Sequence, residues 1–189
     1  MDQRRDALAG AAKLDLALRE IAAEVGDGAV CTSGNVVCKP GIVTSVVETA
    51  EQLLDQRHLD AGKLASMLAS AQEASERFAA EEDVEVAWER IWSIEPILFD
   101  ETLIGFAEEA VREVSGTSHR LPSGPLHDAA EVSRAGVPTV MLFVQSLRGL
   151  SHTKEEDTKP EHLELAVRAL DRLADRTIEK AAASPRAPS

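Results

Sequence analysis

Five histidines are the side chains that most readily support hydrolytic or metal chemistry: His58, His119, His127, His152 and His162. None is paired with another donor at a zinc-binding spacing, since the sequence contains neither H-E-x-x-H nor C-x-x-C. The surroundings of His58, His119 and His162 predict exposed surface positions. His127 and His152 remain as the candidates for chemistry.

These two candidates follow features that position ligands. His127 ends a glycine-containing turn, residues 121–127, directly before a predicted helix, where backbone N–H groups can face an anion or a developing oxyanion. His152 follows a predicted strand by a short loop, and such loops are where α/β proteins place ligands. From spacing alone, His152 is either a metal ligand or a loop imidazole bonded to Glu155 and Glu156.

Two serines beside these histidines are weaker candidates for a nucleophile. Neither Ser123 nor Ser151 lies in a G-x-S-x-G elbow. Ser151 and His152 are adjacent in the chain, which is a poor geometry for activation by a base. Nucleophilic serine catalysis is therefore disfavoured.

Four apolar stripes with helical spacing predict the helices that would position these residues. The first lies within residues 6–25, the second follows Asp60, the third lies within residues 100–116, and the fourth begins after Pro160. Asp60 and Asp100 are the expected N-caps. We expect all four stripes to face the core, because a one-sided apolar stripe is how a helix buries its face.

Strand patterns lie between the helices. Residues 29–38 and 42–47 are β-branched and flank a K-P-G turn, and residues 53–57 continue after a bend. Residues 84–88 alternate apolar and polar side chains, which predicts a sheet with one covered face. Residues 137–144 are apolar except for Thr139, which predicts a strand buried on both faces.

The order of these elements predicts a mixed α/β protein in two parts. Residues 1–97 would form a small α+β sandwich with an antiparallel sheet. Residues 98–180 would form part of an α/β layer, too short to supply both neighbours of the buried strand. The last residues, 181–189, are expected to be a disordered tail.

The composition of the chain argues against several classes of protein. The formal net charge of the 189 residues is −13, which opposes binding to nucleic acid or anionic membranes. The N-terminus lacks the apolar stretch of a signal peptide, and the longest apolar run, residues 140–144, is far shorter than a membrane span. Cys31 and Cys38 are expected on opposite faces of a strand, without a disulfide. These features predict a reduced, cytoplasmic protein.

Two C-terminal stretches resemble a known family. S-G-P-L-H-D-A at residues 123–129 and G-L-S-H-T-K-E-E-D-T at residues 149–158 flank the apolar run. They are similar to S-G-A-G-H-D-A and G-I-S-H-x-P-x-E-x-T of the metal-dependent N-carbamoyl-amino-acid amidohydrolases, allantoate amidohydrolases and β-ureidopropionases. These are relatives of the zinc aminopeptidases and aminoacylases. Residues 1–7 resemble the segment after the family's H-A-G-T-T-P, and L-D-Q-R-H at residues 54–58 resembles an element of its lid domain.

The resemblance implies an architecture and roles for single residues. In that family a lid domain, which also dimerises, is inserted into an α/β catalytic domain; residues 1–97 would be the lid and residues 98–180 the returning catalytic segment. It implies that His152 is the last ligand of a two-metal site containing zinc or manganese. Arg57 would bind the carboxylate of a small-molecule substrate, and Gly124 would lie in the turn that contacts this substrate.

The sequence departs from the family pattern at other substrate-facing positions. Thr44 stands where the family has asparagine, and Pro125 and Leu126 replace the alanine and second glycine of S-G-A-G. Proline lacks an N–H, and a leucine side chain hinders close approach. Lys154 replaces the proline that follows the ligand histidine in the family.

The resemblance implies a metal-dependent hydrolase of C–N bonds in N-carbamoyl-amino acids or related ureido and amide substrates. One histidine cannot hold two metals, so we expect these 189 residues to be inactive without a further catalytic segment. Two alternatives stay open: a non-catalytic dimerisation or binding module, and a decayed product that folds poorly. Upstream DNA encoding H-x-D, a Glu-Glu pair and H-A-G-T-T-P would favour the enzyme.

Overall fold

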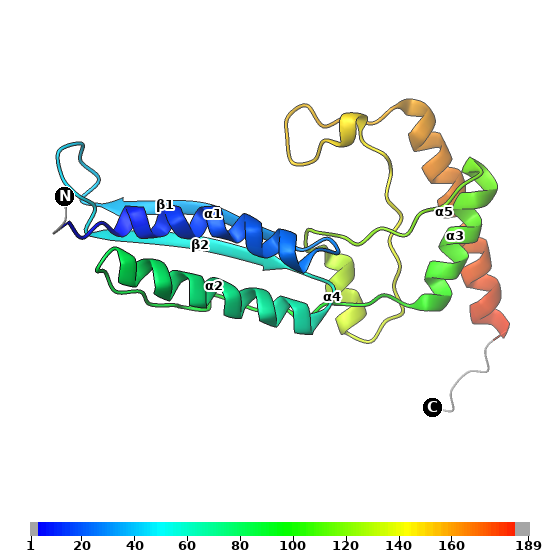
Figure 1. The fold of residues 1–189 in the computed structure, drawn as a ribbon. Coiled ribbons are helices and arrows are strands. Elements are labelled where there is room, and N and C mark those ends of the chain that lie inside the picture. Colours follow the sequence, from blue (N-terminus) through cyan, green and yellow to red (C-terminus); the bar gives the residue numbers. More distant parts are fainter. Residues whose placement is uncertain (1–3, 184–189) are drawn as a thin grey trace. The chain divides into compact units, whose positions relative to one another are not determined.

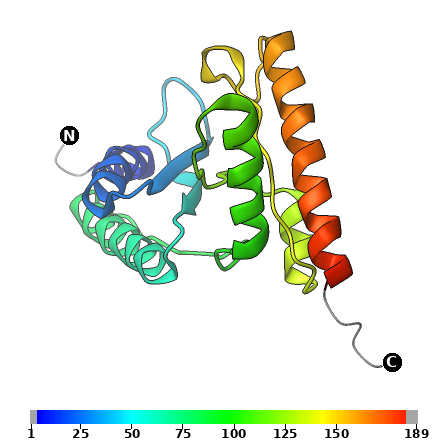
Figure 2. The ribbon, with the colours of Figure 1, turned by 90° about the vertical axis from the view of Figure 1, so that its right-hand side faces the viewer.

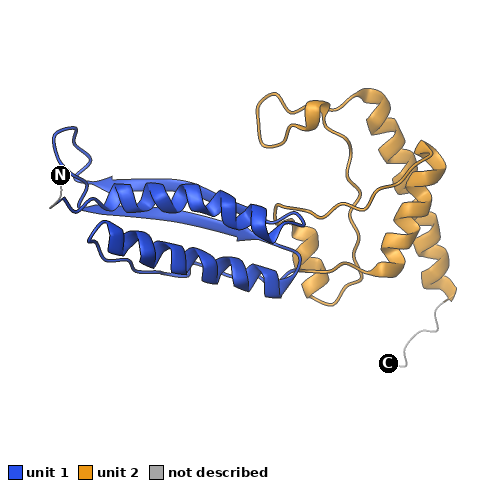
Figure 3. Cartoon of the chain, in the orientation of Figure 1, with its two compact units in different colours: residues 1–96 blue, residues 97–189 orange. Residues whose placement is uncertain are grey.

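A computed structural model describes residues 4–183, which divide into two compact units between Pro96 and Ile97 (Figure 3). The elements of unit 1 are α1 (Ala7–Val25), β1 (Val30–Lys39), β2 (Thr49–Arg57) and α2 (Ala61–Glu81). The elements of unit 2 are α3 (Glu101–Ser115), α4 (Asp128–Arg134), the 3₁₀ helix η1 (Leu147–Gly149) and α5 (Pro160–Ala183) (Figure 1). The expected mixed α/β class is confirmed.

The long helices begin and end at the residues that the sequence indicates. The carboxylates of Asp60 and Asp100 accept hydrogen bonds from the backbone N–H groups of the third helical residues, at 2.8 Å and 2.9 Å. Gly116 ends α3 in the left-handed conformation, with φ of 81°, which glycine adopts without a steric cost. These local signals explain why the helix bounds could be predicted closely.

The sheet of unit 1 contains two antiparallel strands, and its details differ from the prediction. Residues 42–47 form the connection between the strands, and β2 begins at Thr49. A bulge between Ser33 and Asn35 shifts the alternation, so Cys31 and Cys38 both occupy half-buried positions rather than opposite faces. Both thiols are free. Seven residues of strand separate them by about 23 Å, which is too far for a disulfide.

The core of unit 1 forms where α1 and α2 meet. Leu14, Leu18 and Ile21 of α1 pack against three buried residues of α2, which are Met67, Ala71 and Ala74. Leu54 of β2 packs on the edge of this cluster. Figure 2 shows the two helices side by side on one face of the sheet. The small side chains of α2 allow the helices to approach closely.

Unit 2 has a smaller core between α3 and α5. Ala107 and Ala110 of α3 and Leu173 of α5 are its buried residues, and Val140 and Leu142 pack against them. The expectation that the whole apolar stripe of α5 faces the core is wrong in part, because Leu163, Val167 and Leu170 of that stripe are exposed, as is Ile178. Unit 2 therefore buries only part of its apolar surface.

Two predicted strands are absent from the described part of the chain. Residues 84–88 and 137–144 carry strand-like sequences but belong to neither strand of the sheet. A strand requires a hydrogen-bonded neighbour, which its own sequence cannot supply. The predicted tail begins too early, because α5 continues to Ala183; the rest of that tail lies outside the described residues. None of the helices within residues 4–183 combines the length and apolar run needed to cross a bilayer.

Candidate functional site

Arg57 lies at the end of β2 and is held by an acidic neighbour on the same strand. Its Nε donates a hydrogen bond to Asp55 Oδ2 at 2.6 Å, and Nη2 lies 2.6 Å from the same oxygen. Gln56, between them, points to the helices, where its amide donates to the backbone oxygen of Met67 at 3.1 Å. Because side chains alternate along a strand, Asp55 and Arg57 belong to the face without helices. The Arg57 side chain is 48 % exposed.

His58 directly follows Arg57 and is half-buried, whereas the sequence predicts exposure. The backbone N–H of Asp60 donates to His58 Nδ1 at 2.8 Å. This contact places the proton of the neutral ring on Nε2. His58 Nε2 is buried and has no hydrogen-bond partner among the described residues. The ring therefore has a structural role at the junction of β2 and α2.

Charged side chains surround this junction. The backbone N–H of Lys63 donates to Asp60 and lowers the pKa of that carboxyl group below its ordinary value. The Lys63 ammonium group donates a hydrogen bond to Asp27, and this bond lowers the pKa of Asp27. Both carboxylates therefore keep their negative charge at neutral pH. The N-terminal end of α2 thus combines two carboxylates with the ammonium group of Lys63.

Thr44 lies in the β1–β2 connection and is exposed. The backbone turns here, with the N–H of Ser45 donating to the oxygen of Ile42 at 3.2 Å. Three aliphatic side chains around Thr44 are also exposed, which are Ile42, Val43 and Val46. Thr44 and Arg57 thus belong to unit 1 but to different segments of it.

The turn that contains Gly124, Pro125 and Leu126 precedes α4 in unit 2. The Ser123 hydroxyl donates to the backbone oxygen of Pro125 at 2.9 Å and closes the turn on itself. Leu126 is exposed. His127 is the N-cap residue of α4, but its side chain makes no capping bond; its ring packs edge-on against Phe143 with the centroids 6.3 Å apart. The expected helix after this turn is confirmed, although α4 is short.

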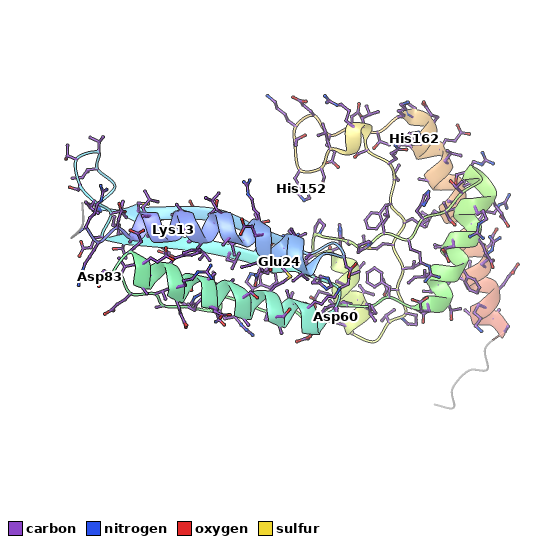
Figure 4. The ribbon with its side chains drawn as sticks, viewed as in Figure 1. Lys13, Glu24, Asp60, Asp83, His152 and His162 are labelled. Atoms are coloured by element: carbon purple, nitrogen blue, oxygen red, sulfur yellow. The ribbon has the colours of Figure 1, made fainter. Side chains whose placement is uncertain are left out.

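His152 is exposed in the loop between η1 and α5, away from His162 at the start of α5 (Figure 4). Its backbone has a φ of 59°, a conformation that non-glycine residues adopt infrequently. The backbone N–H of His152 donates to a carboxylate oxygen of Glu156 at 2.8 Å. Ser151 Oγ lies 2.5 Å from His152 Nδ1, which leaves Nε2 as the nitrogen able to act as a donor or ligand.

The described residues do not assemble a complete metal site. Across residues 4–183, no group of three or more histidine, cysteine, aspartate or glutamate side chains has an arrangement that could hold a metal ion. His152 is the one candidate ligand that the sequence singles out, and a hydrolytic zinc site needs three protein ligands. The donor set of residues 4–183 therefore does not fit a metal without further ligands.

Some neighbours of the candidate residues were missed at the sequence level. Asp55 could have been found, because residues two apart on a strand share a face. Glu156 was considered only as a carboxylate near the His152 ring, whereas it accepts from the His152 backbone N–H. Phe143 is sixteen residues from His127 in the chain, and no local pattern predicts their contact.

Comparison with known proteins assigns the family. Residues 6–176 match peptidase family M20/M25/M40. The chain belongs to this family of hydrolases, and it is similar to amidohydrolases within it. The N-carbamoyl-L-amino acid amidohydrolase of Geobacillus stearothermophilus is 31 % identical over 156 residues, covering 82 % of this chain and 38 % of that protein. The allantoate amidohydrolase of Bacillus subtilis is 28 % identical over 170 residues, covering 90 % of this chain and 41 % of that protein.

A solved structure supports the same relationship. An amidase of the hydantoinase/carbamoylase family from Burkholderia multivorans is 31 % identical, with a TM-score of 0.84. The similarity covers 93 % of this chain and 43 % of that one. The chain thus spans about two fifths of the length of the relatives that it matches.

Proposed function

We propose that this chain forms part of an amidohydrolase that hydrolyses C–N bonds of N-carbamoyl-amino acids or related ureido and amide substrates. The similarity to an N-carbamoyl-L-amino acid amidohydrolase and to an allantoate amidohydrolase supports this substrate class. In this proposal unit 1 is a lid that binds the substrate and unit 2 is a segment of the catalytic domain. A cytoplasmic location is part of this proposal.

The observation that carries the proposal is the arrangement at the end of β2. Arg57 lies within the L-D-Q-R-H element, its side chain is 48 % exposed, and Asp55 orients its guanidinium. A guanidinium offers five N–H donors in a planar fork, a geometry suited to binding a carboxylate. N-carbamoyl-amino acids carry such a carboxylate. Arg57 is therefore proposed to hold the substrate, with Thr44, Gly124, Pro125 and Leu126 as further contacts.

His152 is proposed as one metal ligand of the complete site. Because the described residues do not form a three-ligand group, we assign no catalytic step to a metal within this chain. The remaining ligands and the general base would come from polypeptide beyond these 189 residues. We therefore expect the chain alone, supplied with zinc or manganese, to release no amino acid from N-carbamoyl-amino acids at an ordinary enzymatic rate.

A hybrid enzyme tests the function. The matched region of the Geobacillus amidohydrolase is replaced by residues 4–183 of this chain. We expect the hybrid to release amino acids from N-carbamoyl-amino acids. In the hybrid, Arg57→Ala should raise KM by about 10- to 100-fold, the effect of losing a charge-assisted hydrogen bond of about 1.5–3 kcal/mol.

Two controls make this result specific. Arg19→Ala removes an exposed arginine of α1 and should leave KM unchanged. A carbamoyl substrate that lacks the carboxylate should react equally poorly with the parent hybrid and with Arg57→Ala. A folded hybrid with no hydrolytic activity would contradict the proposal and favour a non-catalytic binding module.

We also propose that the protein forms a homodimer through unit 1. The outer edge of β1 is unpaired among the described residues, and Val30 and Val37 are exposed large apolar residues on that strand. Open strand edges readily pair with another chain. Sedimentation at increasing concentration checks this proposal, and a monomer at the highest concentration contradicts it.

A further inference from the structure

Arg57 is the last residue of β2, and the chain leaves the sheet directly after it. On one side its backbone is held by the sheet, where Val30 at the start of β1 is its cross-strand partner. On the other side only residues 58–60 separate it from the first residue of α2. The direction in which the Arg57 side chain leaves the strand end therefore depends on this short connection as well as on the sheet.

A hydrogen bond from a side chain to the backbone closes this connection. His58 Nδ1 accepts the backbone N–H of Asp60, two residues further along the chain, at 2.8 Å. Asparagine and aspartate close tight turns with the same kind of contact, from a side-chain oxygen to the N–H two residues on. The bond fixes the path of the backbone immediately after Arg57.

Two further bonds extend from Asp60 to the connection between α1 and β1. The Asp60 carboxylate accepts the backbone N–H of Lys63 at 2.8 Å, and the Lys63 ammonium group donates to Asp27. Asp27 lies in the turn that leads into β1. The connections on both sides of this end of the sheet are thus joined through the first turn of α2. We call this series of bonded residues the junction brace, and its members are His58, Asp60, Lys63 and Asp27.

The contacts of the His58 ring show which of its atoms requires a histidine. Its Nε2 is buried and has no hydrogen-bond partner among the described residues. Burying an N–H group without a partner costs free energy, so an apolar ring of similar shape would pack at least as well. In contrast, Nδ1 makes a polar contact that an apolar ring could not make. The acceptor at Nδ1 is therefore the distinctive contribution of His58.

We infer that His58 is a positioning residue for Arg57, because its Nδ1 acceptor fixes the chain at the end of β2. The inference rests on the proposed role of Arg57 in binding a substrate carboxylate. Asp55 orients the guanidinium itself, through a hydrogen bond of 2.6 Å, whereas His58 constrains the main chain that carries it. Both constraints matter for a planar fork, since its hydrogen bonds to a carboxylate depend on direction.

Two substitutions of His58 test the inference in the full chain. His58→Phe keeps an aromatic ring of similar size and removes the acceptor. His58→Asn loses the ring but keeps an acceptor, since the side-chain oxygen of asparagine is bonded to Cγ as Nδ1 is in histidine. Hydrogen exchange is measured by NMR at the backbone amide of Asp60 and at the Nε–H of Arg57, which donates to Asp55.

We expect His58→Phe to speed exchange at both groups by about 3- to 10-fold, the effect of losing one neutral hydrogen bond. His58→Asn should restore most of the protection. A purely structural role of the ring predicts the reverse order, because asparagine loses more buried apolar area than phenylalanine. Unchanged exchange at Arg57 Nε–H in His58→Phe overturns the inference, and so does equally fast exchange in the two variants.

An ion pair at the other end of α2 provides a matched control. Lys63 of the junction brace is 40 % exposed, and Lys13, which lies 2.7 Å from a carboxylate oxygen of Glu81, is 38 % exposed. Lys13 and Asp60 lie toward opposite ends of α2 (Figure 4). Lys63→Met should speed exchange at Arg57 Nε–H by about 2- to 3-fold, as expected for an exposed ion pair, and Lys13→Met should leave it unchanged. Equal effects of the two variants would indicate a general loss of stability and overturn the inference.

The hybrid enzyme tests what the position of Arg57 serves. There His58→Phe should raise KM for an N-carbamoyl-amino acid by about 3- to 10-fold with kcat nearly unchanged, and a carbamoyl substrate without the carboxylate should be unaffected. An equal increase in KM for both substrates overturns the inference. A hybrid without activity contradicts the proposed function instead, and the exchange of Arg57 Nε–H in the chain still decides whether His58 positions Arg57.

Discussion

Asp55 and Arg57 share the helix-free face of β2, and one oxygen of the Asp55 carboxylate lies 2.6 Å from both Nε and Nη2 of Arg57. The pair orients the guanidinium before any ligand arrives. Asp55 would also compete with a substrate carboxylate for Arg57, because it already balances part of the arginine's positive charge.

Substitution of Asp55 tests this competition. In the hybrid enzyme, Asp55→Asn should lower KM for an N-carbamoyl-amino acid by about 2- to 5-fold, because the exposed ion pair is worth no more than about 1 kcal/mol. The measurement is steady-state kinetics with and without the substrate carboxylate. An increase in KM would show instead that Asp55 acts chiefly by positioning Arg57.

The buried face of α1 should dominate the stability of unit 1. Leu18 is 1 % exposed in the shared core, whereas Leu16 on the same helix is 65 % exposed. Leu18→Ala should reduce the free energy of unfolding by about 2–5 kcal/mol, since it removes packed atoms and leaves a cavity. The matched change Leu16→Ala should stay within about 0.5 kcal/mol. Urea denaturation of both variants measures the difference, and equal effects would contradict the observed core.

The N-cap of α3 should contribute measurably to unit 2. The Asp100 carboxylate accepts the Leu103 N–H at 2.9 Å, so Asp100→Ala leaves that donor without its partner. We expect a loss of about 1 kcal/mol in the free energy of unfolding. Asp100→Ser retains an oxygen acceptor and should recover most of this loss. If the serine variant is as unstable as the alanine variant, capping is not the cause.

The acid sensitivity of unit 2 should depend on Arg120. Its guanidinium donates to Glu108 at 2.8 Å and to Glu101 at 2.8 Å, and the bond to Arg120 lowers the pKa of Glu108 below its ordinary value of 4.5. A carboxyl group whose pKa is lower in the folded state stabilises the protein at pH values above its unfolded-state pKa. This stabilisation is lost as the pH falls through the folded-state pKa.

Arg120→Gln should therefore lower Tm at pH 7 and have little effect at a pH below the folded pKa of Glu108. A carbon-detected NMR titration should show the Glu108 pKa rising toward its ordinary value in the variant. An equal decrease in Tm at both pH values would show that the contribution of Arg120 does not depend on the charge of Glu108.

The sequence by itself determined the helices and the candidate residues. Asp60, Asp100 and Gly116 act on backbone groups within a few residues of themselves, so their effect can be predicted without knowing the fold. The motifs around Arg57 and His152 likewise identified the family, which the match over residues 6–176 shows. These signals depend only on residues close together in the chain, so the sequence is enough to interpret them.

Only the tertiary structure decided which apolar segments become strands. Residues 137–144 are apolar enough for a buried strand, yet they belong to no sheet among the described residues, although the N–H of Asp100 donates to the backbone oxygen of Thr139 at 3.1 Å. The bulge at Ser33 placed Cys31 and Cys38 at equivalent half-buried positions, against the simple count of residues. A helix satisfies its own backbone, whereas a strand depends on partners distant in the chain, and the folded structure alone shows whether those partners are present.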